Sequence, residues 1–283
     1  PLRIRDYSRC CNAFGPDNRV FSWVCQILPF LEEGSVHDID TTIELSETPI
    51  SMYFCPSRRG PVQNPENQRW LMDYGGTTPT PSRSQMGGPY LQANDYDQVL
   101  DRGCSTIWGF WGQRGQGNDH YANLQSPGNT STYTAYWGVF VRSDYAVEAG
   151  SGETGDPVLK DLGAGFGRLT TFSRITDGTS KTSMVIEKRI PSDGYLVQST
   201  DDDAGWSDGW DFDTMRLTIC RPVADSDTQV VSKDVTAGSA HTAGLNTLFA
   251  DGSVHFITYD IDLETFNRIG HRADGENVDL DEL

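Results

Sequence analysis

Hydrophobic and polar positions recur along the chain in patterns that predict a few short helices and strands. Between residues 19 and 33 the apolar residues follow the spacing of one helix face until the run meets Pro29. We therefore predict a helix over about 19–33 that is interrupted or ended near this proline. Residues 50–60 form an apolar, β-prone run that closes in Cys-Pro-Ser, which predicts a buried strand ending in a turn.

A third pattern, in residues 182–190, alternates strictly and predicts another strand. The alternation divides its side chains between two faces, with Met184, Ile186 and Lys188 on one and Val185, Glu187 and Arg189 on the other. Glu187 is therefore expected to lie partly buried.

The pair Asp251-Gly252 lies between two strand-forming runs, NTLFA and SVHFI, and predicts a β-hairpin with a two-residue turn. This register predicts three facing pairs on the two strands: Phe249 with Val254, Leu248 with His255, and Asn246 with Ile257.

His241 stands ten residues before Asp251. If residues 246–250 are extended at ~3.3 Å per residue, the strand is roughly 17 Å long, and His241 lies beyond the end opposite Asp251. We expect it near Asp260 and Asp262, as a loop histidine hydrogen-bonded to backbone or carboxylate. A metal ligand or a catalytic base is the alternative, since imidazole suits both roles.

Asp251 and Gly252 are interpreted as turn residues. Residues from about 61 to 135 are polar and rich in glycine and proline, which indicates a loop-rich β insertion. We predict a single domain over residues 1–283, with a C-terminal sheet at about 168–260.

The charge of −18 excludes nucleic acid and anionic lipid as favoured partners, because the surface would repel both. Six cysteines without paired CxxC spacing argue against a metal-thiolate site and fit an exported protein with at least one disulfide. No apolar run reaches the ~20 residues that span a bilayer. Because the chain starts at Pro1 without a signal-peptide pattern, we expect a processed or shortened form whose targeting segment precedes this residue.

One spacing and seven segments carry a resemblance to a known family. A histidine, nine residues and Asp-Gly run from His241 to Gly252. The segments are WVCQILPFLEE (23–33), YFCPSRR (53–59), DYGG (73–76), GVF (138–140), ITDGTSKTSMVIE (175–187), GWSDGW (205–210) and FADGSVHFI (249–257). In these the chain resembles a large family of exported bacterial proteins with a prepilin-type N-terminus, named for the domain with that histidine spacing.

The resemblance implies an α+β, pilin- or pseudopilin-like fold, in which an antiparallel β-sheet packs on a long N-terminal helix. In such proteins the first half of that helix is hydrophobic and anchors or polymerises the subunit. That segment would precede Pro1, so any membrane contact of this chain would depend on it.

The acid-rich loop 199–213 offers oxygen ligands of the kind that calcium prefers, although it lacks the EF-hand order. The candidate metal ligands in it are Asp201, Asp203, Asp208, Asp211 and Asp213. A solvated acidic loop is the alternative. Trp206 and Trp210 could stack a sugar ring, with Glu187 as a further ligand-binding residue, or could pack in the core.

No GxSxG, HExxH, Rossmann or P-loop motif is found, so we expect a protein without enzymatic activity. The leading hypothesis is a structural or interaction protein, a pilin-like subunit of a cell-surface or extracellular filament or a secretion-type assembly. It would associate with itself or with other surface proteins. One alternative is an extracellular glycan- or solute-binding module. The other is a metal-dependent hydrolase that gathers Glu187, Asp208 and His241.

Overall fold

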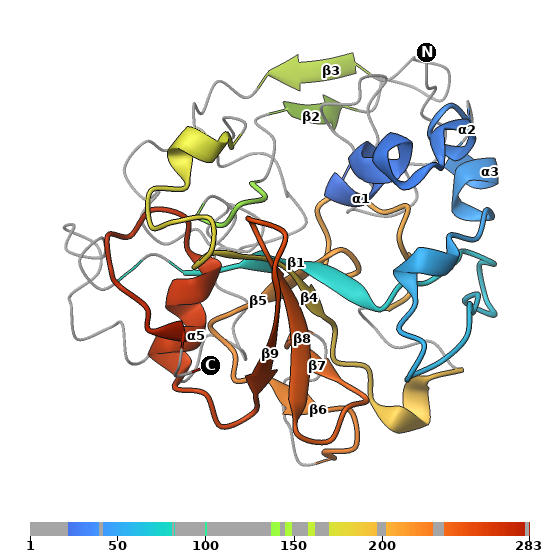
Figure 1. The fold of residues 1–283 in the computed structure, drawn as a ribbon. Helices are drawn as coiled ribbons and strands as arrows, with labels where there is room; N and C mark the ends of the chain where they lie inside the picture. The colour runs from blue at the N-terminus through green and yellow to red at the C-terminus, as the bar shows by residue number, and fades with distance from the viewer. Residues whose placement is uncertain are drawn as a thin grey trace.

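A computed structural model gives the fold (Figure 1). It describes residues 22–39, 42–80, 82, 100, 137–141, 145–148, 158–161, 170–196, 202–228, 235–280 and 283. The helical segments are α1 (Trp23–Ile27), η2 (Leu28–Leu31), α2 (Gly34–His37), α3 (Thr42–Ser46), η3 (Ser51–Tyr53), η6 (Phe172–Arg174), η7 (Ser192–Gly194) and α5 (Leu263–Gly270). The strands are β1 (Tyr74–Thr78), β2 (Tyr145–Glu148), β3 (Val158–Asp161), β4 (Ser183–Glu187), β5 (Met215–Leu217), β6 (Val223–Ala224), β7 (Gly238–Ser239), β8 (Gly244–Phe249) and β9 (Val254–Thr258).

Five strands form the central sheet in the order β5-β1-β4-β8-β9. Three of its pairings are antiparallel, but β1 and β5 run parallel. The fold is therefore α+β, as predicted, and the predicted antiparallel pairing is found for every pair of the sheet except β1 with β5. The long connection from β4 to β5 lets the chain turn back before it reaches the far side of β1, which makes the parallel pairing possible.

The two faces of the sheet bury separate apolar clusters. Val185 of β4 packs with the cluster that includes Trp23 of α1, and its neighbour Ile186 packs with the cluster that includes Phe266 of α5. Consecutive strand residues point to opposite faces, so α1 and α5 cover opposite sides of the sheet. Figure 1 shows them on either side of the β8–β9 pair.

The predicted helix over 19–33 is short where the structure describes it. It consists of α1 and the 3-10 turn η2, and Pro29 lies in the first turn of η2. Proline tolerates that position because the first N–H groups of a helix have no partner within the helix. Residues 19–21 lie outside the described residues.

The strand predicted over 50–60 is wrong. Residues 51–53 form η3, Phe54 is extended, and the N–H of Arg58 closes a turn on the carbonyl of Cys55. Tyr53, Phe54 and Cys55 are all buried, so this segment packs on several sides instead of showing one face to solvent. Tertiary packing has overridden the local β propensity.

The predicted loop-rich insertion at 61–135 contains β1, an interior strand of the sheet. Its sequence, Tyr-Gly-Gly-Thr-Thr, contains two adjacent glycines, which are more typical of a loop than of a strand. The packing requires at least one of them, because a Cβ on Gly76 would lie 2.7 Å from the ring of Phe140 and 2.8 Å from the sulfur of Met215. Glycine here allows close packing within a strand.

The predicted hairpin is present as β8 and β9, but its register differs by one residue. The observed pairs are Leu248 with Val254, Thr247 with His255, Asn246 with Phe256, Leu245 with Ile257 and Gly244 with Thr258. The loop has three residues instead of two: the N–H of Phe249 donates to the carbonyl of Ser253, and Gly252 has a φ of +90°. A type I turn followed by a left-handed glycine explains this register.

The turn yields a prediction for stability. Gly252→Ala should lower the free energy of unfolding by about 1 kcal/mol, because the left-handed conformation is unfavourable for alanine, whereas glycine adopts it freely. Gly34→Ala is the matched control, since its new Cβ meets no atom within 4 Å and its φ is not positive. Urea unfolding of both variants measures the difference. Equal losses in the two variants would contradict the assigned turn.

Candidate functional site

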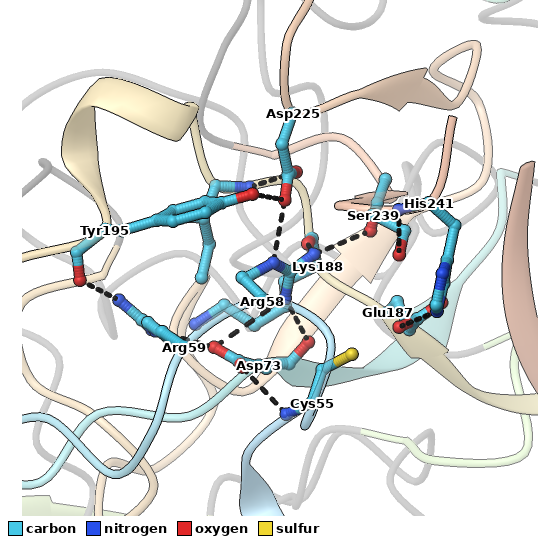
Figure 2. A network of polar contacts seen from close by, with 12 residues as sticks. Cys55, Arg58, Arg59, Asp73, Glu187, Lys188, Tyr195, Asp225, Ser239 and His241 are labelled. Carbon is cyan, nitrogen blue, oxygen red and sulfur yellow. Dashed lines mark hydrogen bonds and ion pairs between the residues drawn. The ribbon is translucent and has the colours of Figure 1, made fainter. Parts of the chain in front are cut away.

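Six ionised side chains lie buried together beside the sheet, and Figure 2 shows most of them. We call them the buried ion network: Arg58, Arg59, Lys188, Asp73, Asp202 and Asp225. None of these side chains is more than 2% exposed. Three cations face three carboxylates, so the charges of the network balance.

Arg58 lies at the centre of the network. Its Nε donates to Oδ2 of Asp225 at 2.7 Å, and its Nη1 is 3.6 Å from Oδ1 of Asp73. Its Nη2 donates to the carbonyls of Lys188 at 2.6 Å and Gly238 at 3.2 Å. Burial acts to lower the pKa of this guanidinium, but Asp225 and Asp73 reverse the effect and raise it. Arg58 therefore stays charged.

Arg59 and Lys188 extend the network to the acid-rich loop. Nε of Arg59 donates to Oδ1 of Asp73 at 2.8 Å, and its Nη2 donates to Oδ2 of Asp202 at 2.8 Å. Nζ of Lys188 donates to Oδ1 of Asp202 at 3.1 Å and to the carbonyl of Asp213 at 2.9 Å. Burial would raise the pKa of Asp202, but Lys188 and Arg59 hold it below its usual range.

Segments that carry the family resemblance meet in this network. Arg58 and Arg59 end YFCPSRR, Asp73 begins DYGG, and Lys188 directly follows ITDGTSKTSMVIE. Sequence reasoning missed the network, because it placed the two arginines in the turn after a predicted buried strand and assigned them no partners. The signal that could have found it is an arginine pair two residues after an apolar run.

A second group brings together Cys55, Glu187 and His241, which the figure shows beside the network (Figure 2). One ligand atom from each lies within 4.8 Å of the others. Nε2 of His241 is 3.8 Å from Oε1 of Glu187, beyond hydrogen-bond distance, and this carboxylate is not one of the two, Asp260 and Asp262, near which the histidine was predicted. The structure therefore joins Glu187 and His241, with Cys55 instead of Asp208 as the third member.

His241 and Asp251 lie beyond opposite ends of β8, as predicted. Asp251 is exposed at the hairpin turn, where its Oδ1 accepts hydrogen bonds from the N–H of Ser253 at 2.8 Å and from its hydroxyl at 2.6 Å. The carbonyl of His241 accepts a bond of 2.8 Å from the hydroxyl of Tyr259, beside the far end of β9. The histidine and the Asp-Gly pair, which define the spacing described above, therefore lie at opposite ends of one strand.

Three of the five predicted metal ligands, Asp208, Asp211 and Asp213, form a buried acidic cluster. Oδ1 of Asp213 accepts from the N–H groups of Ala204 and Gly205, and its Oδ2 is buried without a hydrogen-bond partner among the described residues. Burial and the neighbouring carboxylates raise the pKa of Asp208 well above its usual value. Burial also raises the pKa of Asp213, to about 6.

The other predicted residues of this loop lie elsewhere. Asp203 is outside the cluster, and its carbonyl accepts from the side chains of Asn64 and Asn67. Asp201 lies outside the described residues.

One tryptophan of the loop, Trp206, lies in the core, and the other, Trp210, packs against it. The ring of Trp206 is fully buried 5.9 Å from that of Tyr53, and Trp210 packs partly buried against the same cluster. A buried ring presents no face to a sugar, so the geometry does not support stacking on Trp206.

A third group holds Asp177, His271 and Asp274. The carboxylate of Asp177 accepts the N–H groups of Asp274 and Gly275, and Nδ1 of His271 accepts that of Ala273. Burial lowers the pKa of His271 to about 3, so its ring is neutral. These bonds hold a loop together and use several of the donor atoms that a metal would need.

Cys220 takes part in a disulfide bond whose other half lies outside the described residues, whereas Cys25 and Cys55 are free and buried. Among the described residues, no helix combines the length and the apolar character that crossing a bilayer requires.

Fold and site together define an α+β protein with a mixed five-stranded sheet and a charge-balanced buried ion network. Residues 7–264 match a family described as a protein of unknown function, DUF1559, and the chain belongs to this family. No curated protein and no solved structure matches the chain.

The network predicts a large loss of stability when one cation is removed. Arg58→Met should lower the free energy of unfolding by about 3–5 kcal/mol, because it leaves Asp225 and Asp73 buried without their central cation. Arg268→Met is the control: this side chain is about a third exposed and pairs with Glu264, so its loss should cost at most ~1 kcal/mol. Denaturant unfolding compares the two. Similar small losses would show that the network does not stabilise the fold.

Proposed function

We propose that this chain is a non-enzymatic, exported structural or interaction protein. It acts as a pilin-like subunit of a cell-surface or extracellular filament, or of a secretion-type assembly. The main support for the proposal is the structural role of residues in and next to the segments that carry the family resemblance. Arg58, Arg59, Asp73 and Lys188 donate or accept bonds inside the fold, and so serve architecture instead of a reaction.

The outer strand of the sheet supports association with other subunits. Within the described part of the chain β9 has one neighbour, β8, and it exposes Val254 and Phe256 on the same face. Val254 is 65% exposed and Phe256 is 45% exposed. Exposed apolar side chains on a terminal strand favour contact with another protein surface. Self-association through this strand is therefore the contact we propose.

Expression of the complete gene in its native bacterium, with an epitope tag, tests the role. We expect the protein in the cell-surface fraction in assembled form, and Phe256→Glu should lower the assembled share because it places a charge in an apolar contact. Phe172→Glu is the control, since Phe172 is also exposed but belongs to η6 and not to β9. Surface fractionation and electron microscopy measure the outcome. A protein that stays in the cytoplasm, or reaches the surface only as a monomer, would refute the role.

We also propose that calcium binds the buried acidic cluster of Asp208, Asp211 and Asp213. Calcium prefers carboxylate and carbonyl oxygens, and these three side chains bring their oxygens together in the interior. The cation would relieve the repulsion between buried like charges. The partnerless Oδ2 of Asp213 would supply one of its ligands.

Calcium should therefore stabilise the protein, by about 2.7 kcal/mol at a concentration 100 times its dissociation constant. Asp213→Asn should abolish the effect while its remaining oxygen still accepts from Ala204 and Gly205. Asp260→Asn, in an exposed turn, is the control and should respond like the unaltered protein. Thermal unfolding after chelator treatment, with and without calcium, measures the shift. No shift in the unaltered protein, or the same shift in Asp213→Asn, would exclude this site.

A further inference from the structure

We propose that Cys55, Glu187 and His241 form a zinc site, separate from the acidic cluster and independent of the proposed filament role. Their ligand atoms lie within 4.8 Å of one another, with 3.8 Å between Nε2 of His241 and Oε1 of Glu187. Zinc binds sulfur at about 2.3 Å and nitrogen or oxygen at about 2.0–2.2 Å, which sets tetrahedral ligand atoms roughly 3.5 Å apart. Small side-chain movements are enough to reach that geometry.

The donor atoms select the metal. A thiolate, an imidazole and a carboxylate suit zinc, whereas calcium and magnesium prefer oxygen ligands alone. Three protein ligands leave a fourth position for water. The side chain of His241 is 33% exposed, so the site has a route to solvent on that side.

Neighbouring groups hold two of the three ligands in place. Oε2 of Glu187 accepts from the backbone N–H of Asn246 at 2.7 Å and from its side-chain amide at 3.3 Å, which leaves Oε1 directed at His241. The N–H of Cys55 donates to Oδ2 of Asp73 at 2.8 Å. Bonds of this kind orient metal ligands before the metal arrives.

The local charge also favours a cation. The buried ion network pairs its three cations with three carboxylates, so the buried Glu187 beside it adds a further negative charge. A divalent ion would balance the charges of the Glu187 carboxylate and a Cys55 thiolate together.

Zinc would displace the thiol proton of Cys55, because the thiolate is the form that coordinates metal.

The site would connect distant parts of the chain. Cys55 precedes β1, Glu187 ends β4, and His241 lies between β7 and β8. A metal bound to all three would therefore cross-link the end of β4 with two segments that are remote from it in the sequence.

Zinc titration of the purified chain, stripped with a chelator and kept free of oxygen, tests the site. We expect one zinc per chain. Cobalt in its place should give a thiolate-to-metal charge-transfer band and the visible spectrum of a tetrahedral ion. Cys55→Ser should abolish that band, and both Cys55→Ser and His241→Ala should weaken zinc binding more than about 100-fold, beyond the loss usual for a supporting residue.

Two variants control for general effects on cysteine, histidine and folding. Cys25→Ser removes the other free buried cysteine, and His255→Ala removes a histidine of the hairpin that is outside the group. Both should bind zinc like the unaltered protein. Far-UV circular dichroism of each metal-free variant checks that it is folded. No stoichiometric zinc, cobalt bound without a thiolate band, or full zinc binding by folded Cys55→Ser would overturn the proposal.

Discussion

The guanidinium of Arg58 can lie in the protein interior only if carboxylates reach it, and this electrostatic requirement organises much of the molecule. Asp73 directly precedes β1 and Asp225 lies in the turn after β6, so Arg58 binds one partner near to it in the sequence and another that is 167 residues away. Nη2 of Arg58 donates to the carbonyls of Lys188 and Gly238, which connects Arg58 to the end of β4 and the start of β7. A buried charge tolerates few alternative arrangements, because any that leaves it unpaired is costly.

The same requirement positions the candidate metal ligands. The carboxylate of Asp73 accepts from Arg59 through one oxygen and from the backbone of Cys55 through the other. Glu187 and Lys188 are consecutive, so the network holds the end of β4 on which Glu187 lies. The ion network and the group of Cys55, Glu187 and His241 are thus two parts of one arrangement. The acidic cluster joins it as well, through the bond from Lys188 to the carbonyl of Asp213.

Local sequence signals predicted part of the local structure, although the strand predicted over 50–60 is wrong, and they predicted little of the long-range structure. The strand at 182–190, the turn at Asp251-Gly252 and the separation of Asp251 from His241 all follow from alternation and turn chemistry. The predicted register of the hairpin was wrong because the sequence Ala-Asp-Gly fits both a two-residue and a three-residue loop. β1 was missed because its glycines serve packing against Phe140 and Met215, which are remote in sequence. The ion network was missed for the same reason, since its partners are separated by up to 167 residues.

The order of strands in the sheet has a consequence for how the chain acquires its structure. Both neighbours of β1, which are β4 and β5, come more than a hundred residues later, and the sheet is complete only when β9 has formed. At the usual synthesis rate of about 5–20 residues per second, β1 leaves the ribosome several seconds before β5 exists to pair with it. Such distant pairing slows folding and leaves the nascent strand without its partners while the later segments are synthesised.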